Sequence, residues 1–168
     1  MLDQRLEQLS AWIASRYRIS PPKLASVSGD ASFRRYFRFQ YQEKPLIAVD
    51  APPEHENNIA FWQLGQLLAK HSICVPQFYE VDFKLGFLIL SDLGDQLLLP
   101  LLTQQNVDHY YQQAIETILN IQQIPFSELT DTPDYNEDKL YFELNLFNQW
   151  FIKKHLQLSL NPQEESII

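Results

Sequence analysis

The stretch SGDASFRRYFRFQ, residues 28–40, sets the pattern from which the fold can be read. Gly29-Asp30 supplies turn chemistry, and from Phe33 to Phe39 the side chains alternate with the period of two that is typical of a strand. One face of that strand carries Phe33, Arg35, Phe37 and Phe39, and the other carries Arg34, Tyr36 and Arg38. Such a segment can be a nucleic-acid platform, a phosphate-handling hairpin or a core strand with a solvated back, and its residues alone leave all three open.

The flanking segments extend this strand into a sheet. Short apolar runs separated by Gly, Pro and polar turns predict five strands, at Leu24–Val27, Phe33–Phe39, Leu46–Asp50, Val75–Val81 and Phe87–Leu90. Ala51-Pro52-Pro53 breaks the pattern after the third strand, and Asn57 or Asn58 is expected to cap the helix that follows. Ser91–Gly94 is expected to form a turn after the fifth strand.

Helices are predicted on both sides of these strands. Apolar side chains at three- and four-residue steps predict an opening helix that Pro21-Pro22 ends. After Gln96 the pattern is helical only, with one helix around Val107–Leu119 and another around Leu140–Phe151. The order of strands, helix, strands and then helices is that of the small lobe of protein-kinase-like folds.

The composition indicates a folded protein, since 45% of the 168 residues are hydrophobic and 13% are aromatic. The formal net charge of -8 repels a phosphate backbone, so nucleic acid is not an expected partner. Cys74 is the only cysteine and cannot form an internal disulfide, which fits a reducing compartment. No run approaches the roughly 20 apolar residues of a membrane-spanning helix, so we expect a cytoplasmic protein without a membrane segment.

Four segments are specific in combination: SGDASFRRYFRF, IAVDAPPE, VPQFYEVDFKLGFLILSDLGD and LYFELNLFNQWFIKKHL. Over nearly its whole length the chain resembles the aminoglycoside-phosphotransferase-like kinases, and most closely the bacterial anomeric kinases that phosphorylate N-acetylmuramate and N-acetylglucosamine at C1 in cell-wall recycling. The resemblance implies an α+β, protein-kinase-like fold: a five-stranded antiparallel small lobe with one helix, followed by the first helices of a truncated helical lobe. The implied domains are residues 1–94, the N-terminal nucleotide-binding lobe with its leading helix and hinge, and residues 95–168, an incomplete helical C-terminal lobe.

The same resemblance implies a nucleotide site between the hairpin tip and the turn after the fifth strand. The tip that would cover the phosphates of ATP consists of Gly29, Asp30, Ala31, Ser32 and Phe33. As a hinge, Ser91–Gly94 would recognise adenine through the Ser91 carbonyl and the Leu93 N–H, with Leu90 and Val49 as apolar walls. A plain hairpin turn and a surface turn are the simpler interpretations of the two segments.

The third strand departs from the kinase pattern. Its sequence, IAVD, has Asp50 where a Val-Ala-Ile-Lys strand places a phosphate-binding lysine, and a carboxylate cannot bind phosphate in that way. We therefore expect an arginine of the neighbouring strand to substitute; the candidates are Arg34, Arg35 and Arg38, and Arg35 is included among the nucleotide-binding residues. Asp50 is expected to orient one of them through a charge-assisted bond, whereas a solvated strand face is the simpler interpretation of any one arginine.

The helix YNEDKLYFELNLFNQWFIKKHL resembles the substrate-side helix of the family, which implies that Glu143 and Trp150 line an amino-sugar site. A packed helix with a solvated Glu143 is the alternative. The family's His-x-Asp loop and Ile-Asp-Phe element do not occur in this sequence, so no catalytic or metal-ligating residue is predicted. The implied cofactors are ATP and Mg, with Mg ligands expected only in a missing second half, and the chain alone is expected to be inactive and to bind nucleotide weakly.

Two other functions compete with this one. A non-catalytic half-kinase that binds or regulates a partner would expose Leu144, Phe147 and Phe151, so we expect self-association unless a partner covers them. A single-strand nucleic-acid binder would stack bases on the aromatics of Phe33–Phe37, but these divide between two faces and the net charge opposes the idea. The expected partners are a nucleotide and an amino sugar, without nucleic acid or membrane.

Overall fold

The computed structural model describes residues 3–27, 32–129 and 134–165 of the chain. It divides into two compact units, Met1–Thr130 and Asp131–Ile168, and each is described by itself. The first unit contains the sheet, the helices that cover it and one further long helix. The described part of the second unit is helical.

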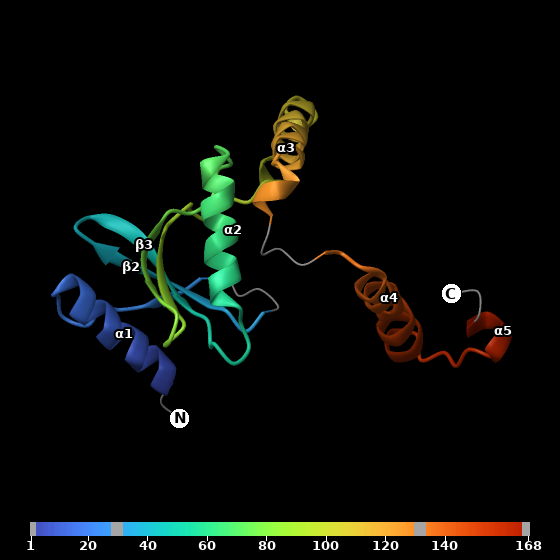
Figure 1. Cartoon of the computed structure of the whole chain (residues 1–168), viewed down its shortest axis with the longest axis horizontal. Coiled ribbons are helices and arrows are strands. Elements are labelled where there is room, and N and C mark those ends of the chain that lie inside the picture. The colour runs from blue at the N-terminus through green and yellow to red at the C-terminus, as the bar shows by residue number, and fades with distance from the viewer. Residues whose placement is uncertain (1–2, 28–31, 130–133, 166–168) are drawn as a thin grey trace. The chain divides into compact units, whose positions relative to one another are not determined.

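The first unit is built on a five-stranded antiparallel sheet in the order β1-β2-β3-β5-β4 (Figure 1). The strands are β1 (Ala25–Ser26), β2 (Arg35–Tyr41), β3 (Lys44–Asp50), β4 (Phe78–Asp82) and β5 (Phe87–Ser91). Short turns join β2 to β3 and β4 to β5, whereas β3 and β4 are separated by a helix. The sequence-based expectation of an α+β fold with a five-stranded antiparallel sheet is therefore confirmed.

β2 and β4 begin two and three residues later than predicted, and in both strands the N–H of a residue predicted to belong to the strand bonds a side chain instead of the neighbouring strand. The N–H of Phe33 donates to the Glu56 carboxylate over 3.1 Å, so β2 begins after it. The N–H of Gln77 donates to the Ser91 hydroxyl over 2.9 Å, and Pro76 has no N–H to give, so β4 begins after them. Both differences lie beside the candidate site described below.

One face of the sheet is covered by α1 (Gln4–Tyr17), whose side chains Leu9, Trp12 and Ile13 are buried. They pack with sheet residues that point to the same side, namely Phe37, Phe39, Leu46, Ala48, Phe87 and Ile89. The helix begins at a side-chain cap, where a carboxylate oxygen of Asp3 accepts from the Leu6 N–H. The alternation predicted for residues 33–39 is therefore real for the two phenylalanines that lie within β2.

The other face carries α2 (Asn58–Lys70), and Figure 1 shows α1 and α2 on opposite sides of the sheet. The buried side chains on this face of the sheet are Ile47, Val49, Ala51, Leu88 and Leu90, and Tyr36, Phe61 and Phe78 pack against them. Asn57 caps α2, because its side-chain oxygen accepts from the Ala60 N–H over 3.0 Å. This confirms one of the two predicted caps and orients the start of α2 beside the end of β3.

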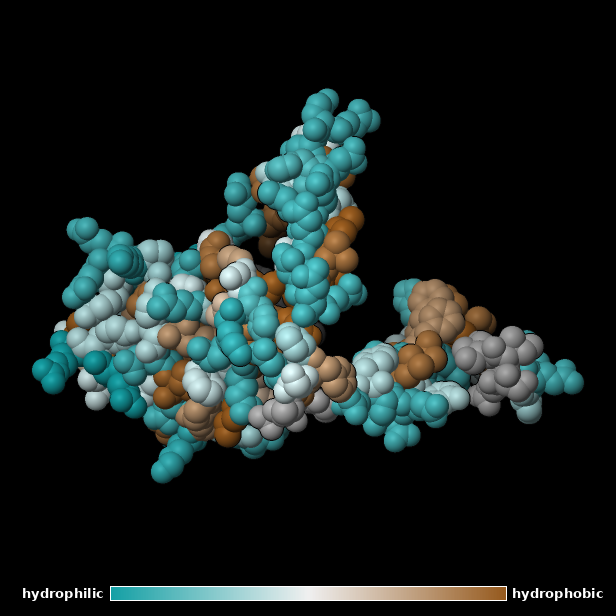
Figure 2. All heavy atoms as spheres, turned by 45° about the horizontal axis from the view of Figure 1, so that its top comes forward, coloured by the Kyte–Doolittle hydropathy of each residue, from teal (hydrophilic) through white to brown (hydrophobic). Residues whose placement is uncertain are grey.

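The remaining helices of the first unit are α3 (Val107–Gln122) and two 3-10 helices (Leu99–Leu101 and Phe126–Glu128). The described part of the second unit contains α4 (Glu137–Leu146), a π-helix (Phe147–His155) and α5 (Pro162–Glu165). Four apolar side chains of α3 are at least half exposed, namely Tyr111, Ile115, Ile118 and Leu119. Figure 2 shows apolar atoms along one side of this helix. None of the helices in the described residues has the length and apolar content that crossing a membrane requires.

Candidate functional site

A pocket opens where β5 leaves the sheet, on the face that also carries α2. Its cavity volume is about 190 Å³, and it is lined by Val27, Tyr36, Arg38, Ile47, Pro76, Leu90, Ser91, Asp92, Leu93 and Gly94. Strand register explains why these residues meet, since Ile47 lies opposite Arg38 on β2 and opposite Leu90 on β5. The pocket therefore combines the three central strands with the segment that follows them, and we call Ser91–Asp95 the hinge segment.

The pocket is an apolar slot with backbone groups of the hinge segment along one edge. Ile47 and Leu90 are nearly fully buried and form its base, while the hinge segment runs along its edge. The beginning of that edge is fixed, because Ser91 donates its N–H to the Gln77 carbonyl over 2.9 Å and accepts the Gln77 N–H on its hydroxyl. Such a slot suits a flat aromatic ring whose polar edge meets backbone groups.

Three of the predicted adenine-contacting residues, Leu90, Ser91 and Leu93, lie together in this pocket. Val49 is fully buried opposite Tyr36 and Leu88 and does not line it. Ile47, two positions earlier on the same face of β3, takes the place expected of Val49. The period of two along β3 makes both residues equivalent in the sequence, so only the strand register distinguishes them.

Arg38 binds the hinge segment directly. Its guanidinium donates to the Asp92 carboxylate through Nη2 over 3.0 Å and through Nε. It donates to the Asp95 carboxylate through Nη1 over 2.6 Å and through Nη2 over 2.8 Å. Arg38 holds the pKa of both carboxyl groups below their ordinary values, mainly by hydrogen bonding. The two aspartates were not predicted; the one signal in the sequence is a pair of carboxylates that flanks Leu93-Gly94 in the turn.

At the base of the predicted phosphate hairpin, Arg34 pairs with Glu56 over 3.1 Å and lies 4.4 Å from the ring centroid of Phe61. Phe33 is largely exposed, and its ring stacks on His55 at 4.3 Å. The exposed Ser32 accepts the Arg34 N–H on its hydroxyl. Of the predicted tip, Gly29, Asp30 and Ala31 lie outside the described residues, whereas Ser32 and Phe33 lie at its C-terminal end, beside the start of α2.

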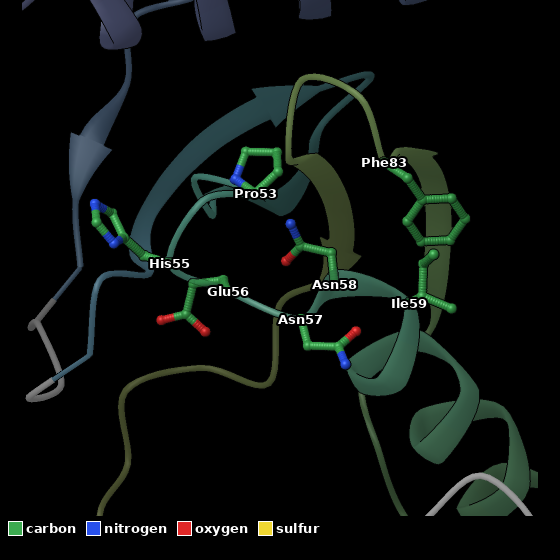
Figure 3. Close-up of a pocket in the computed structure, with 7 residues that line it drawn as sticks. All are labelled: Pro53, His55, Glu56, Asn57, Asn58, Ile59 and Phe83. Carbon is green, nitrogen blue, oxygen red and sulfur yellow. The ribbon is translucent and has the colours of Figure 1, made fainter.

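Beside this hairpin base lies a second, open cavity of about 380 Å³, shown in Figure 3. It is lined by Pro53, His55, Glu56, Asn57, Asn58, Ile59 and Phe83. Asn58 is buried in its wall and donates to the Ala51 carbonyl over 2.8 Å, which ties the start of α2 to the end of β3. The side-chain oxygen of Asn58 is itself buried away from solvent, so this cavity offers no reachable polar anchor from that residue.

Asp50 faces α1 rather than the pocket. It is fully buried and accepts from Arg5 Nε over 2.7 Å and from Arg35 Nε over 3.0 Å, and Arg35 also binds Asp3 at the start of α1. The Asp3 and Asp50 carboxylates raise the pKa of Arg35, and Arg35 lowers that of Asp3. The prediction that Asp50 orients a neighbouring arginine is confirmed, and the arginine is Arg35, held on the opposite face of the sheet from Ile47.

In the second unit, the two predicted sugar-site residues are available to solvent. Glu143 lies in α4 and accepts from the Tyr135 hydroxyl over 2.5 Å, which raises the pKa of Tyr135. Trp150 is 59% exposed in the π-helix, with the Lys154 ammonium 3.9 Å from its ring centroid. Across the described ranges of both units, no group of three or more His, Cys, Asp or Glu side chains gathers in a way that could hold a metal ion.

Comparisons with known proteins bear on these observations. Residues 23–167 match the family model described as the phosphotransferase enzyme family. The chain is 35% identical to the N-acetylmuramate/N-acetylglucosamine kinase of Pseudomonas aeruginosa, over 96% of this chain and 50% of that protein. It is 32% identical to the kinase of the same name from Pseudomonas putida and 28% identical to that from Neisseria meningitidis. The chain spans about half the length of these curated relatives, and no solved structure gives a significant match.

Proposed function

Because the chain belongs to the phosphotransferase enzyme family, we propose that it forms the nucleotide-binding part of an ATP-dependent kinase for an amino sugar. The resemblance expected from the sequence is confirmed by the family match and by relatives that are named as sugar kinases. The sugars in those names, N-acetylmuramate and N-acetylglucosamine, are the proposed acceptors, with a sugar 1-phosphate as product. Such a kinase would act in the recycling of cell-wall sugars in the cytoplasm.

The observation that carries this proposal is the pocket beside the hinge segment. Its apolar base of Ile47 and Leu90 fits an adenine ring, and the proposed edge contacts are the Ser91 carbonyl and the Leu93 N–H. Adenine recognition by backbone groups depends on the position of the main chain rather than on side-chain type. This explains why so specific a function leaves so little signal in the sequence of the hinge segment.

The phosphates of ATP would extend from this pocket toward the hairpin that precedes β2. Residues Gly29 to Phe33 are proposed to cover them, and Arg34 is the arginine on the pocket side of the sheet that lies nearest to this hairpin in the sequence. Magnesium bound with ATP would neutralise the charge that develops on the transferred phosphoryl group. Its ligands and the catalytic base are proposed to come from outside the described residues.

The acceptor sugar would bind in the second unit. Glu143 supplies a carboxylate that can accept hydrogen bonds from sugar hydroxyl groups, and Trp150 supplies an exposed aromatic surface against which a sugar ring can pack. We further propose that the exposed Leu144, Phe147 and Phe151 side chains promote self-association. Sedimentation of the chain as a monomer at all concentrations would contradict that last proposal.

The test of the function is ADP and ATP binding measured by calorimetry, with a variant that fills the pocket. Val27→Phe adds a ring at the pocket wall and should weaken nucleotide binding at least tenfold, whereas Gln40→Phe places the same ring at an exposed β2 position that does not line the pocket and should leave affinity unchanged. Equal nucleotide affinity of the two variants would refute the site. We expect no sugar phosphate from the chain alone, and robust turnover would contradict that expectation.

A further inference from the structure

Arg38 occupies a position that a plain surface ion pair does not explain. It lies in the middle of β2, yet its guanidinium reaches carboxylates that are 54 and 57 residues away in the chain, one on each side of Leu93-Gly94. The side chain of Arg38 also lines the pocket itself. A single arginine therefore joins the strand beneath the pocket to the segment along its edge.

In the part of the chain that the structure describes, the hinge segment after Ser91 is restrained mainly through the hydrogen bonds of Asp92 and Asp95. Gly94 has φ +86, and a Cβ built there would meet no atom within 4 Å, so side-chain packing does not hold this residue in place. Its N–H donates to Asp92 Oδ1 over 2.8 Å, and the same oxygen accepts from Arg38 Nη2. The turn is thus held through Asp92, and Asp92 is held through Arg38.

The bonding pattern requires the geometry of arginine. Arg38 donates through three nitrogens to the four oxygens of two carboxylates, with Nη2 bonding both Asp92 and Asp95. A lysine ammonium is a point charge on a flexible chain and cannot span both carboxylates in a fixed plane. Replacement of this arginine by lysine therefore keeps the charge and removes the bridging.

We propose that Arg38 is a positioning residue of the nucleotide site, which holds Asp92 and Asp95 so that the backbone of Leu93 and Gly94 stays at the edge of the pocket. This inference rests on the proposed nucleotide-binding function. Without the Arg38 guanidinium, the hinge segment samples arrangements in which the backbone of Leu93 and Gly94 no longer lies at the edge of the pocket. The apparent nucleotide affinity is then the affinity of the ordered form multiplied by the fraction of molecules that keep the edge in position.

Two variants separate a positioning role from a purely structural one. Arg38→Lys should weaken ADP binding about tenfold, if about one molecule in ten keeps the bound arrangement. Asp95→Asn removes the charge of the exposed carboxylate only and should reduce ADP affinity by a smaller factor. This second variant keeps the inference testable even if Arg38→Lys does not fold. Arg16→Lys is the matched control, since the exposed Arg16 side chain does not line the pocket and pairs with Asp82 at 3.8 Å.

The same variants are compared without nucleotide by amide hydrogen exchange at Gly94. Faster exchange in Arg38→Lys than in Arg16→Lys, at unchanged global stability and together with weaker ADP binding, supports the inference. Unchanged exchange and unchanged ADP affinity in Arg38→Lys would overturn it while leaving the proposed function intact. A wild-type chain that does not bind ADP would overturn the proposed function, and the positioning role of Arg38 with it.

Discussion

Removal of the Asp50 charge should destabilise the first unit more than removal of an ordinary surface charge. Asp50→Asn keeps the volume of the side chain but leaves Arg5 and Arg35 without the buried anion that binds both. Asp50 accepts three charge-assisted hydrogen bonds from these two arginines, and bonds of this kind contribute about 1.5–3 kcal/mol each. Because the two arginine side chains are 31% and 40% exposed and can be rehydrated, we expect a smaller total than the sum, about 2–4 kcal/mol.

The assay is urea unfolding at pH 7 followed by tryptophan fluorescence, for which Trp12 is a suitable reporter because it is buried at the α1 interface and contacts Phe87. Glu54→Gln, an exposed carboxylate in the next loop, is the matched control and should change stability by less than about 0.5 kcal/mol. The double variant Asp50→Asn with Arg5→Gln should lose less than the two single losses combined. A loss below about 1 kcal/mol for Asp50→Asn, or strict additivity, would refute the assigned role of this cluster.

Three further predictions concern other parts of the first unit. Ile13→Ala should lower the free energy of unfolding by about 2–5 kcal/mol in the same urea assay, because Ile13 is fully buried between α1 and the sheet, and a loss near zero would contradict that packing. Gly86→Ala should lower the thermal unfolding temperature far more than Gly94→Ala, because a Cβ at Gly86 would lie 2.0 Å from a backbone oxygen while a Cβ at Gly94 would meet no atom within 4 Å. Equal decreases in unfolding temperature would contradict the described turns. Because Arg38 lowers the pKa of Asp92, this ion pair contributes stability that is complete above the ordinary Asp pKa of 3.8 and is lost as the pH falls through the folded-state pKa. Arg38→Gln should therefore weaken the dependence of the free energy of unfolding on pH in acid. An unchanged pH profile would argue against the ion pair.

Local pattern was enough to predict much of the fold. The alternation along residues 33–39 placed Phe37 and Phe39 on one face of the strand and Tyr36 and Arg38 on the other, and the structure shows that the first of these faces packs against α1. Such patterns depend on the period of two and on burial, which neighbouring residues in the chain already reveal. The strand ends were less predictable, because Phe33 gives its N–H to a distant carboxylate.

The candidate site was predicted in outline and not in its side-chain partners. Leu90, Ser91 and Leu93, which were predicted to belong to one site, line one pocket in the structure, and their role in nucleotide binding stays a prediction. A turn that follows a buried strand is visible in the sequence, which is why these residues could be grouped. The Arg38 bridge to Asp92 and Asp95 was not predicted, since its bonds join residues more than 50 positions apart. Pairing of that kind depends on strand register, which one sequence without its structure does not specify.

The most direct test of the account is an NMR titration of the chain with ADP, observed at the isoleucine and leucine methyl groups and the backbone amides. The account predicts saturable shifts concentrated at Ile47, Leu90 and the Leu93 and Gly94 amides, with little change at Leu9 and Ile13 on the opposite face of the sheet. Shifts confined to other surfaces, or none at millimolar ADP, would contradict the claim that this pocket is the nucleotide site.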